Sequence, residues 1–239
     1  MEHILITGLD GSGKSTILNA LDKLKRNNSF DVILLPRIDT ENLEKHEKLQ
    51  SAAAFVNTLS HESDLLQIPQ LKAIAIFSSM LLFRPIAKYK SVPSITTLYC
   101  ERHPLIDTGI YAGFYAAKMS EGKIDAEHVK RIDKAYQQEI RYIINLIPRN
   151  LVRKKKISIA FLADFLLRWF YVEKKLDLEN LKSLFHVKLP QKIFYLKASP
   201  EVLMYRLSGR KLIEAHETLE VLSTLSRAYD ALFAFLSDK

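Results

Sequence analysis

The chain has 239 residues, 48% of them hydrophobic and 26% charged, which is the balance of an ordinary globular protein and excludes a disordered or fibrous one. Lys and Arg number 35 against 27 Asp and Glu, so the formal net charge is +8, which favours acidic ligands such as nucleotides and also fits a nucleic acid or an anionic membrane surface. The single cysteine, Cys100, excludes an intramolecular disulfide and any metal site with several cysteine ligands.

The clearest motif lies near the start of the chain. Residues 8–16 read Gly-Leu-Asp-Gly-Ser-Gly-Lys-Ser-Thr and fit the phosphate-binding pattern G-x-x-x-x-G-K-[ST] at every fixed position. Residues 3–7 are apolar and β-branched, as in a buried parallel strand, and the apolar residues within 17–24 recur at helical spacing. A strand, a glycine loop and a helix in this order form a phosphate-binding site from backbone N–H groups and a helix N-terminus.

The residue types of this motif indicate how each would act on the polyphosphate of ATP. Glycines let the backbone approach the phosphates without a clash from Cβ atoms. The ammonium group of Lys14 would reach the β- and γ-phosphates, and the hydroxyl of Ser15 would bind Mg²⁺. ATP and Mg²⁺ are therefore the predicted cofactors, and the predicted ATP-binding residues are Gly8, Asp10, Gly11, Ser12, Gly13, Lys14, Ser15 and Thr16.

Two more strands and a long helix are predicted in the first half of the chain. Residues 31–36 and 95–100 read as the second and third buried strands. Between them, residues 40–64 are polar and expected to be helical in part, and residues 65–87 carry an apolar helical pattern that Pro85 is expected to end or kink.

The next part of the chain is mostly helical. Residues 107–119 look like a loop entering a helix, and residues 124–147 carry another helical pattern. Residues 157–172 form an aromatic stripe at helical spacing, which we assign to core or interface packing rather than to a cofactor site: Phe161, Phe165 and Trp169.

A fourth strand and two helices complete the pattern. The strand is predicted at residues 192–198, Ser199 caps the short helix that follows, and the last helix spans about 217–236. Strands that alternate with helices predict an α/β fold with a three-layer, doubly wound parallel sheet. We expect one P-loop kinase domain over residues 1–239, with an enlarged helical region at about 120–190.

Charged residues that follow the strands are the other candidates for chemistry. Glu101 and Arg102 directly follow the third strand, where the carboxylate would hold a Mg²⁺-bound water and the guanidinium would bind an acceptor phosphate; the alternative is a surface ion pair. Arg37 follows the second strand and is a further candidate for that phosphate. Phe77, on the long helix, either stacks on a base or packs in the core.

A basic segment between the last two helices is a candidate lid. Arg206, Arg210 and Lys211 would close over the donor phosphates; the alternative is a solvated basic helix end.

Several of these stretches together resemble the thymidylate kinase family of P-loop nucleoside monophosphate kinases. Residues 8–16 resemble the loop of that family, and Glu101-Arg102-His103 resembles its Asp-Arg-Tyr or Asp-Arg-His motif. Residues 107–111 resemble the stretch that lines the acceptor site. The similarity continues through residues 189–202 to the lid arginines and into the helix at 217–229.

The resemblance implies an ATP-dependent kinase that transfers the γ-phosphoryl group to a nucleoside monophosphate such as dTMP, for nucleotide biosynthesis. Its implied catalytic residues are Lys14, Arg102, Arg206 and Arg210. The implied substrate-binding residues are Asp10, Arg37, Phe77, Arg102 and Tyr111, and the implied metal-binding residues are Ser15 and Glu101.

Two other functions stay open. The arginine that reads thymine in the family is absent after Phe77, which leaves a kinase of deoxynucleosides or of another small alcohol. The charge of +8 and the basic run at 153–156 leave a non-catalytic, nucleotide-binding regulatory protein or one associated with nucleic acid, although we expect no nucleic-acid partner. We expect a cytoplasmic protein with no membrane span, and a homodimer as in the family.

Overall fold

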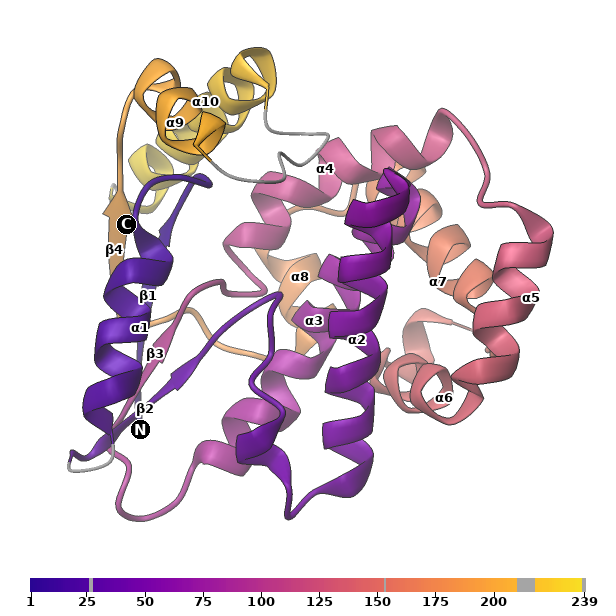
Figure 1. The fold of residues 1–239 in the computed structure, drawn as a ribbon, viewed down its shortest axis with the longest axis horizontal. Coiled ribbons are helices and arrows are strands. Elements are labelled where there is room, and N and C mark those ends of the chain that lie inside the picture. Colours follow the sequence, from indigo (N-terminus) through magenta and orange to yellow (C-terminus); the bar gives the residue numbers. More distant parts are fainter. Residues whose placement is uncertain (26–27, 153, 210–217, 238–239) are drawn as a thin grey trace. The chain divides into compact units, whose positions relative to one another are not determined.

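The computed structural model describes residues 1–25, 28–152, 154–209 and 218–237, and its contacts divide the chain into two compact units (Figure 1). The first unit consists of Met1–Val32, Ser94–Glu101 and Pro190–Lys239. The second consists of Ile33–Pro93 and Arg102–Leu189. The second unit holds the helical region predicted at about 120–190 together with most of the chain before it, and the single domain stays a prediction.

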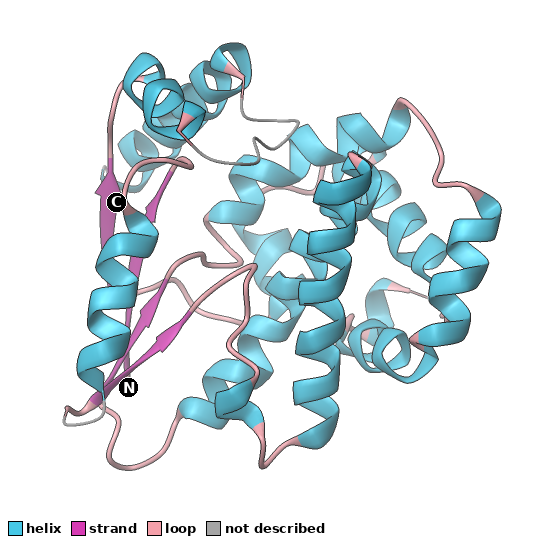
Figure 2. Cartoon of the chain, in the orientation of Figure 1, coloured by secondary structure: helices cyan, strands magenta, loops and turns pink. Residues whose placement is uncertain are grey.

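The first unit is built on a four-stranded parallel sheet (Figure 2). Its strands, in the spatial order β2-β3-β1-β4, are Phe30–Ile33, Thr97–Cys100, Glu2–Gly8 and Lys192–Leu196. Its helices are α1 (Lys14–Leu24), α9 (Pro200–Ser208) and α10 (Leu219–Ser237). All four predicted strands are present, and the α/β class with a parallel sheet is confirmed, with the strand order β2-β3-β1-β4.

β1 lies at the centre of this sheet because its residues are apolar on both faces. Ile4, Leu5 and Ile6 are at most 6% exposed, and the strand pairs with β3 on one side and β4 on the other. The β4 register joins Ile4 to Lys192 and Gly8 to Leu196. The glycine loop therefore begins where the central strand ends, at the carboxyl edge of a parallel sheet.

Helix α10 packs on β1 and β4. The hydroxyl of Tyr229 is hydrogen bonded to Oγ1 of Thr7 over 3.1 Å, and the Tyr229 ring stacks on Tyr195 with centroids 5.2 Å apart. The predicted cap of α9 is confirmed, because Ser199 Oγ accepts from the backbone N–H of Val202. These contacts hold the last helices on the sheet that carries the glycine loop.

The second unit is helical in the residues that the structure describes. Its helices are α2 (Glu47–Leu66), α3 (Pro69–Lys90), α4 (Asp107–Ser120), α5 (Ala126–Ala135), α6 (Gln137–Leu146), α7 (Ile159–Leu166) and α8 (Leu178–Phe185), with a π-helical turn at Leu167–Val172. α2 and α3 lie side by side (Figure 1), joined by an ion pair between Lys72 and Asp64 at 2.8 Å.

Helix α3 forms the core of this unit. Within the described residues it is the one helix long and apolar enough to cross a bilayer, yet 78% of its most apolar 18-residue window is buried in the protein, as is typical of a core helix. The sequence left open that the helix ends at Pro85; in the structure it continues to Lys90. Phe83, Ile86 and Ala87 are buried around the proline, and their burial outweighs a penalty of about 3 kcal/mol for proline inside a helix.

Two predicted helices are interrupted in the structure. The pattern at 65–87 is divided at Gln67, whose left-handed backbone (φ 54°) ends α2 before Pro69 begins α3. The pattern at 124–147 is divided at Tyr136, which leaves the helical conformation (φ −127°, ψ 33°) while its ring packs on Phe55 at 4.8 Å. Both interruptions follow from local backbone and packing choices that apolar periodicity does not report.

Candidate functional site

The glycine loop between β1 and α1 has the backbone of a phosphate cradle. Gly8 and Gly13 have positive φ angles of 150° and 99°, which side chains rarely adopt. A Cβ atom at Gly8 would lie 2.4 Å from the carbonyl oxygen of Leu196, so only glycine fits beside β4. α1 begins after Gly13 with no side-chain cap, so an anion rather than a side chain can interact with this helix N-terminus.

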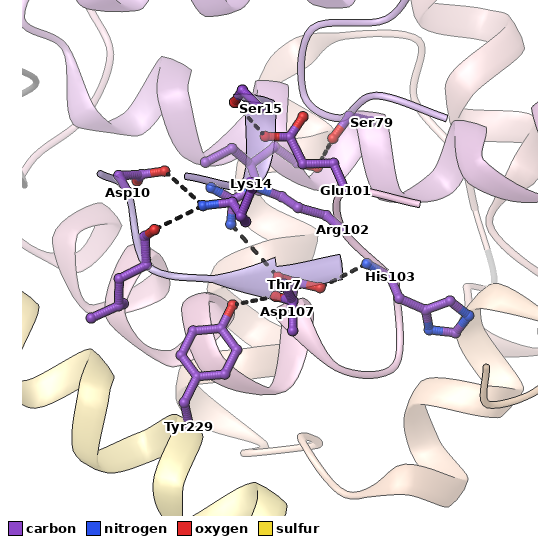
Figure 3. A network of polar contacts seen from close by, with 12 residues as sticks. Thr7, Asp10, Lys14, Ser15, Ser79, Glu101, Arg102, His103, Asp107 and Tyr229 are labelled. Atoms are coloured by element: carbon purple, nitrogen blue, oxygen red, sulfur yellow. Dashed lines mark hydrogen bonds and ion pairs between the residues drawn. The ribbon is translucent and has the colours of Figure 1, made fainter. Parts of the chain in front are cut away.

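Lys14 is held inside this loop (Figure 3). Its ammonium group donates to the backbone carbonyl of Leu9 over 2.9 Å and lies 3.5 Å from Oδ1 of Asp10. The side chain is 4% exposed, so its charge is directed at the loop rather than at bulk solvent. An anion bound in the loop would lie within reach of this ammonium.

Ser15 and Glu101 form an oxygen pair next to the loop, as Figure 3 shows. The Ser15 hydroxyl donates to Oε1 of Glu101 over 3.3 Å, and both residues belong to the first unit. Mg²⁺ takes oxygen ligands and is usually held by one or two protein oxygens together with phosphates and water, so this pair fits the ion. In the described ranges no cluster of three or more His, Cys, Asp or Glu side chains offers an all-protein metal site.

Arg206 reaches the same loop from α9. Its Nη1 donates to the carbonyl oxygen of Gly11 over 3.2 Å. A Cβ atom at Gly11 would lie 3.3 Å from the backbone oxygen of Leu203, so α9 packs closely on the loop. The other predicted lid residues, Arg210 and Lys211, lie outside the described residues.

Arg102 belongs to the second unit, and its side chain is buried. It is 6% exposed, its guanidinium lies 4.7 Å from the ring centroid of Tyr111, and its Nη1 lies 3.7 Å from Oδ1 of Asp107. The other oxygen of Asp107 accepts from the backbone N–H of His103 over 2.7 Å, which holds the carboxylate in place at the start of α4. Arg102 is thus not the surface side chain that the ion-pair alternative required.

Of the remaining residues predicted to bind the acceptor, two lie together and one lies apart from them. Phe77 and Tyr111 line one small cavity of about 20 Å³, together with Thr108. Phe77 is 3% exposed, which is the environment of core packing. Arg37 is exposed and does not line that cavity.

The structure shows one partner each for Arg102 and Phe77 that the sequence did not pair with them. Asp107 pairs with Arg102; in the sequence it was part of the stretch 107–111 that resembles the lining of the acceptor site, but it had no role of its own. Phe165 stacks on Phe77 with centroids 5.7 Å apart, although the two residues are far apart in the sequence. The packing that was predicted for the stripe at 157–172 is confirmed for Phe165 and Trp169, which are buried and stacked at 5.4 Å, whereas Phe161 is half-buried.

Comparison with known proteins gives distant likenesses. No family model matches the chain, and no curated protein matches it in sequence. Among solved structures, the chain is similar to deoxyadenosine kinase from M. mycoides with bound dATP, at 15% identity and a TM-score of 0.42, over 98% of this chain and 84% of that one. It is also similar to thymidylate kinase from Candida albicans, at 15% identity and a TM-score of 0.45, over 96% and 76%.

Proposed function

We propose that the chain is an ATP- and Mg²⁺-dependent phosphotransferase. The observation that carries the proposal is the group of side chains around the glycine loop of the first unit: the buried ammonium of Lys14 and the hydrogen-bonded pair of Ser15 and Glu101. A cation and a pair of hard oxygen ligands at an uncapped helix N-terminus match the charges of a magnesium–polyphosphate complex.

The donor side follows from these contacts. The loop amides and Lys14 would bind the β- and γ-phosphates, and Arg206, which is already anchored to Gly11, would add a second positive charge. Ser15 and Glu101 would hold Mg²⁺, which neutralises phosphate charge when it is bound. The protein then has no covalent chemistry to perform; it aligns the phosphates and stabilises their charge.

The acceptor side begins one residue later in the chain. Arg102 follows Glu101 directly in the chain and is the predicted acceptor ligand. An oxygen of the acceptor would attack the γ-phosphorus, the bond from this phosphorus to the bridging oxygen would break, and ADP would leave with the electron pair. A phosphate acceptor needs no proton transfer, whereas a hydroxyl acceptor releases one proton.

Two classes of acceptor follow from different observations. The family resemblance and the guanidinium of Arg102 favour a nucleoside monophosphate such as dTMP, with Tyr111 beside its phosphate. The absence, after Phe77, of the arginine that reads thymine in the family favours a deoxynucleoside or another small alcohol as the acceptor.

Calorimetry and a coupled assay for ADP test the proposal. We expect saturable heat from ATP with Mg²⁺, and ADP formation that depends on an added acceptor. Lys14→Ala should lower ATP affinity by about tenfold or more, because it removes a charge-assisted contact to phosphate. Lys23→Ala, an exposed lysine on the same helix, is the matched control and should bind ATP like the unaltered protein. No heat from ATP, or equal affinity in Lys14→Ala, would refute the phosphotransferase proposal.

A further inference from the structure

Thr7 is a buried polar residue at the end of an otherwise apolar stretch of strand. Residues 4–6 of β1 are Ile-Leu-Ile, and Thr7, which follows them, is 0% exposed. Its hydroxyl is hydrogen bonded over 3.1 Å to the hydroxyl of Tyr229, which is also 0% exposed (Figure 3). Valine has nearly the shape of threonine and would fill this space with no polar group to satisfy. Burial alone therefore does not require a hydroxyl at position 7.

The ring of Tyr229 is held in place by the sheet and by its own helix. It stacks on Tyr195 of β4 with centroids 5.2 Å apart, and Tyr195 is the register partner of Thr7 in the β1–β4 ladder. Phe233, one turn further along α10, packs on both rings, with centroids 5.9 Å from Tyr229 and 4.8 Å from Tyr195. Because these contacts fix the ring, its hydroxyl fixes where the side chain of Thr7 lies.

Thr7 directly precedes the glycine loop, so its position determines where the loop begins. Gly8 follows it and turns the chain with a φ of 150°. The next residue, Leu9, accepts a hydrogen bond from the ammonium of Lys14 on its carbonyl oxygen, over 2.9 Å. Only Gly8 separates Thr7 from the carbonyl group that orients Lys14. A displacement of Thr7 would therefore displace the ammonium that is predicted to bind phosphate.

The hydrogen bond between Thr7 and Tyr229 restricts position more narrowly than apolar packing would. The energy of a hydrogen bond depends on its distance and angle, whereas the attraction between apolar groups has no direction. Functional groups must be held within about 0.5 Å of the productive geometry, and a displacement of about 1 Å costs on the order of 100-fold in rate. A pair of hydroxyls therefore meets a requirement of the loop that valine and phenylalanine would not meet.

We propose that Tyr229 is a positioning residue of the phosphate loop. Its hydroxyl holds Thr7 so that the loop amides and Lys14 converge on the phosphates of ATP. Tyr229 acts through Thr7 and not on the nucleotide itself. All of these residues belong to the first unit. The inference rests on the proposed phosphotransferase function, because it concerns the binding of ATP by the same loop.

A double-variant cycle on the full chain separates positioning from stability. Tyr229→Phe and Thr7→Val each delete one half of the hydrogen bond and leave the other hydroxyl buried, so each should lower the urea midpoint of unfolding. The variant that carries both changes replaces both hydroxyls by apolar groups, and its midpoint should return towards that of the unaltered protein. Its ATP affinity should not return. We expect calorimetry with ATP and Mg²⁺ to show a fall of about threefold or more in all three variants.

Tyr195→Phe is the matched control variant. It also removes a hydroxyl from the aromatic stack, but this hydroxyl is hydrogen bonded to Ser226 of α10 rather than to Thr7. We expect Tyr195→Phe to bind ATP like the unaltered protein. Thr7→Ser keeps the hydroxyl and loses a methyl group, so it should also keep the original ATP affinity. This pair of results would assign the loss in the other variants to the hydrogen bond.

The outcomes separate this inference from the proposal on which it rests. Affinities are measured where circular dichroism shows each variant to be folded; if a single variant does not fold, the double variant and Thr7→Ser decide. The inference is overturned if Tyr229→Phe or the double variant binds ATP like the unaltered protein. It is also overturned if Tyr195→Phe or Thr7→Ser loses as much affinity as these variants. The phosphotransferase proposal fails by a different result, the absence of ATP binding by the unaltered protein or an unchanged ATP affinity in Lys14→Ala.

Discussion

Two glycines of the phosphate loop are expected to respond differently to the same substitution. Both have positive φ, so replacement by alanine strains the backbone by about 1–2 kcal/mol at either position. At Gly13 nothing lies within 4 Å of the added Cβ, so strain is the whole effect. At Gly8 the Cβ would lie 2.4 Å from the backbone oxygen of Leu196, which is held in the β1–β4 ladder and cannot rotate away.

The two free energies of unfolding give a direct test of this reasoning. Overpacking adds about 1–3 kcal/mol, so we expect Gly8→Ala to lose about 2–5 kcal/mol and Gly13→Ala about 1–2 kcal/mol. Urea unfolding monitored by circular dichroism measures both, provided that the m-values of the variants match that of the unaltered protein. Equal losses, or a larger loss for Gly13→Ala, would show that the close approach of β4 to the loop is not what requires glycine at position 8.

Three further predictions concern the metal ligand, the packing of α10 and a helix cap. Glu101→Gln should raise the Mg²⁺ concentration needed for half-maximal ATP binding by about tenfold, as measured by Mg²⁺ titration in the calorimeter. An unchanged titration would show that Glu101 does not hold the metal. Tyr229→Phe should lower the free energy of unfolding by about 1 kcal/mol in urea, because it deletes the buried hydrogen bond to Thr7; a stability equal to that of the unaltered protein would contradict this. The pKa of Asp177 is lowered, mainly by the hydrogen bond that its carboxylate accepts from the backbone N–H of Asn180 at the start of α8, and then by a side-chain hydrogen bond from Asn180. The carboxylate therefore stabilises the fold at pH values above the ordinary Asp pKa of about 4, and this stabilisation is lost as the pH falls through the lower pKa of the folded state. Asp177→Ala should therefore cost at most about 1 kcal/mol near pH 7, and the difference should vanish in acid unfolding curves; a difference that persists at low pH would contradict the assignment.

The sequence predicted what depends on neighbouring residues. The glycine loop was predictable because the motif, the strand before it and the helix after it are all local, and the structure places Lys14 and Ser15 within that loop. The strand at 97–100 was predictable from β-branched and aromatic residues, and Ser199 from the preference of serine for helix caps.

What the sequence did not predict depends on contacts between distant segments. The sequence left open whether Pro85 ends or kinks α3; that the helix continues depends on burial around Phe83 and Ile86, which a proline rule applied to the helix alone does not include. The stack of Phe165 on Phe77 joins residues from α7 and α3, and periodicity reveals only that each is apolar on its own helix. The base-stacking role of Phe77, taken from the resemblance, stays a prediction.

The pairing of β1 with β4 has a consequence for how the chain reaches its native state during synthesis. Ile4 cannot pair with Lys192, its partner in the ladder, until Lys192 has been synthesised. At a synthesis rate of about 5–20 residues per second, the interval between the two residues is roughly 10–40 s. Both segments of the helical unit, which ends at Leu189, leave the ribosome earlier. We therefore expect the helices to assemble while the first strand is still unpaired on one edge, so the nascent phosphate loop is completed last.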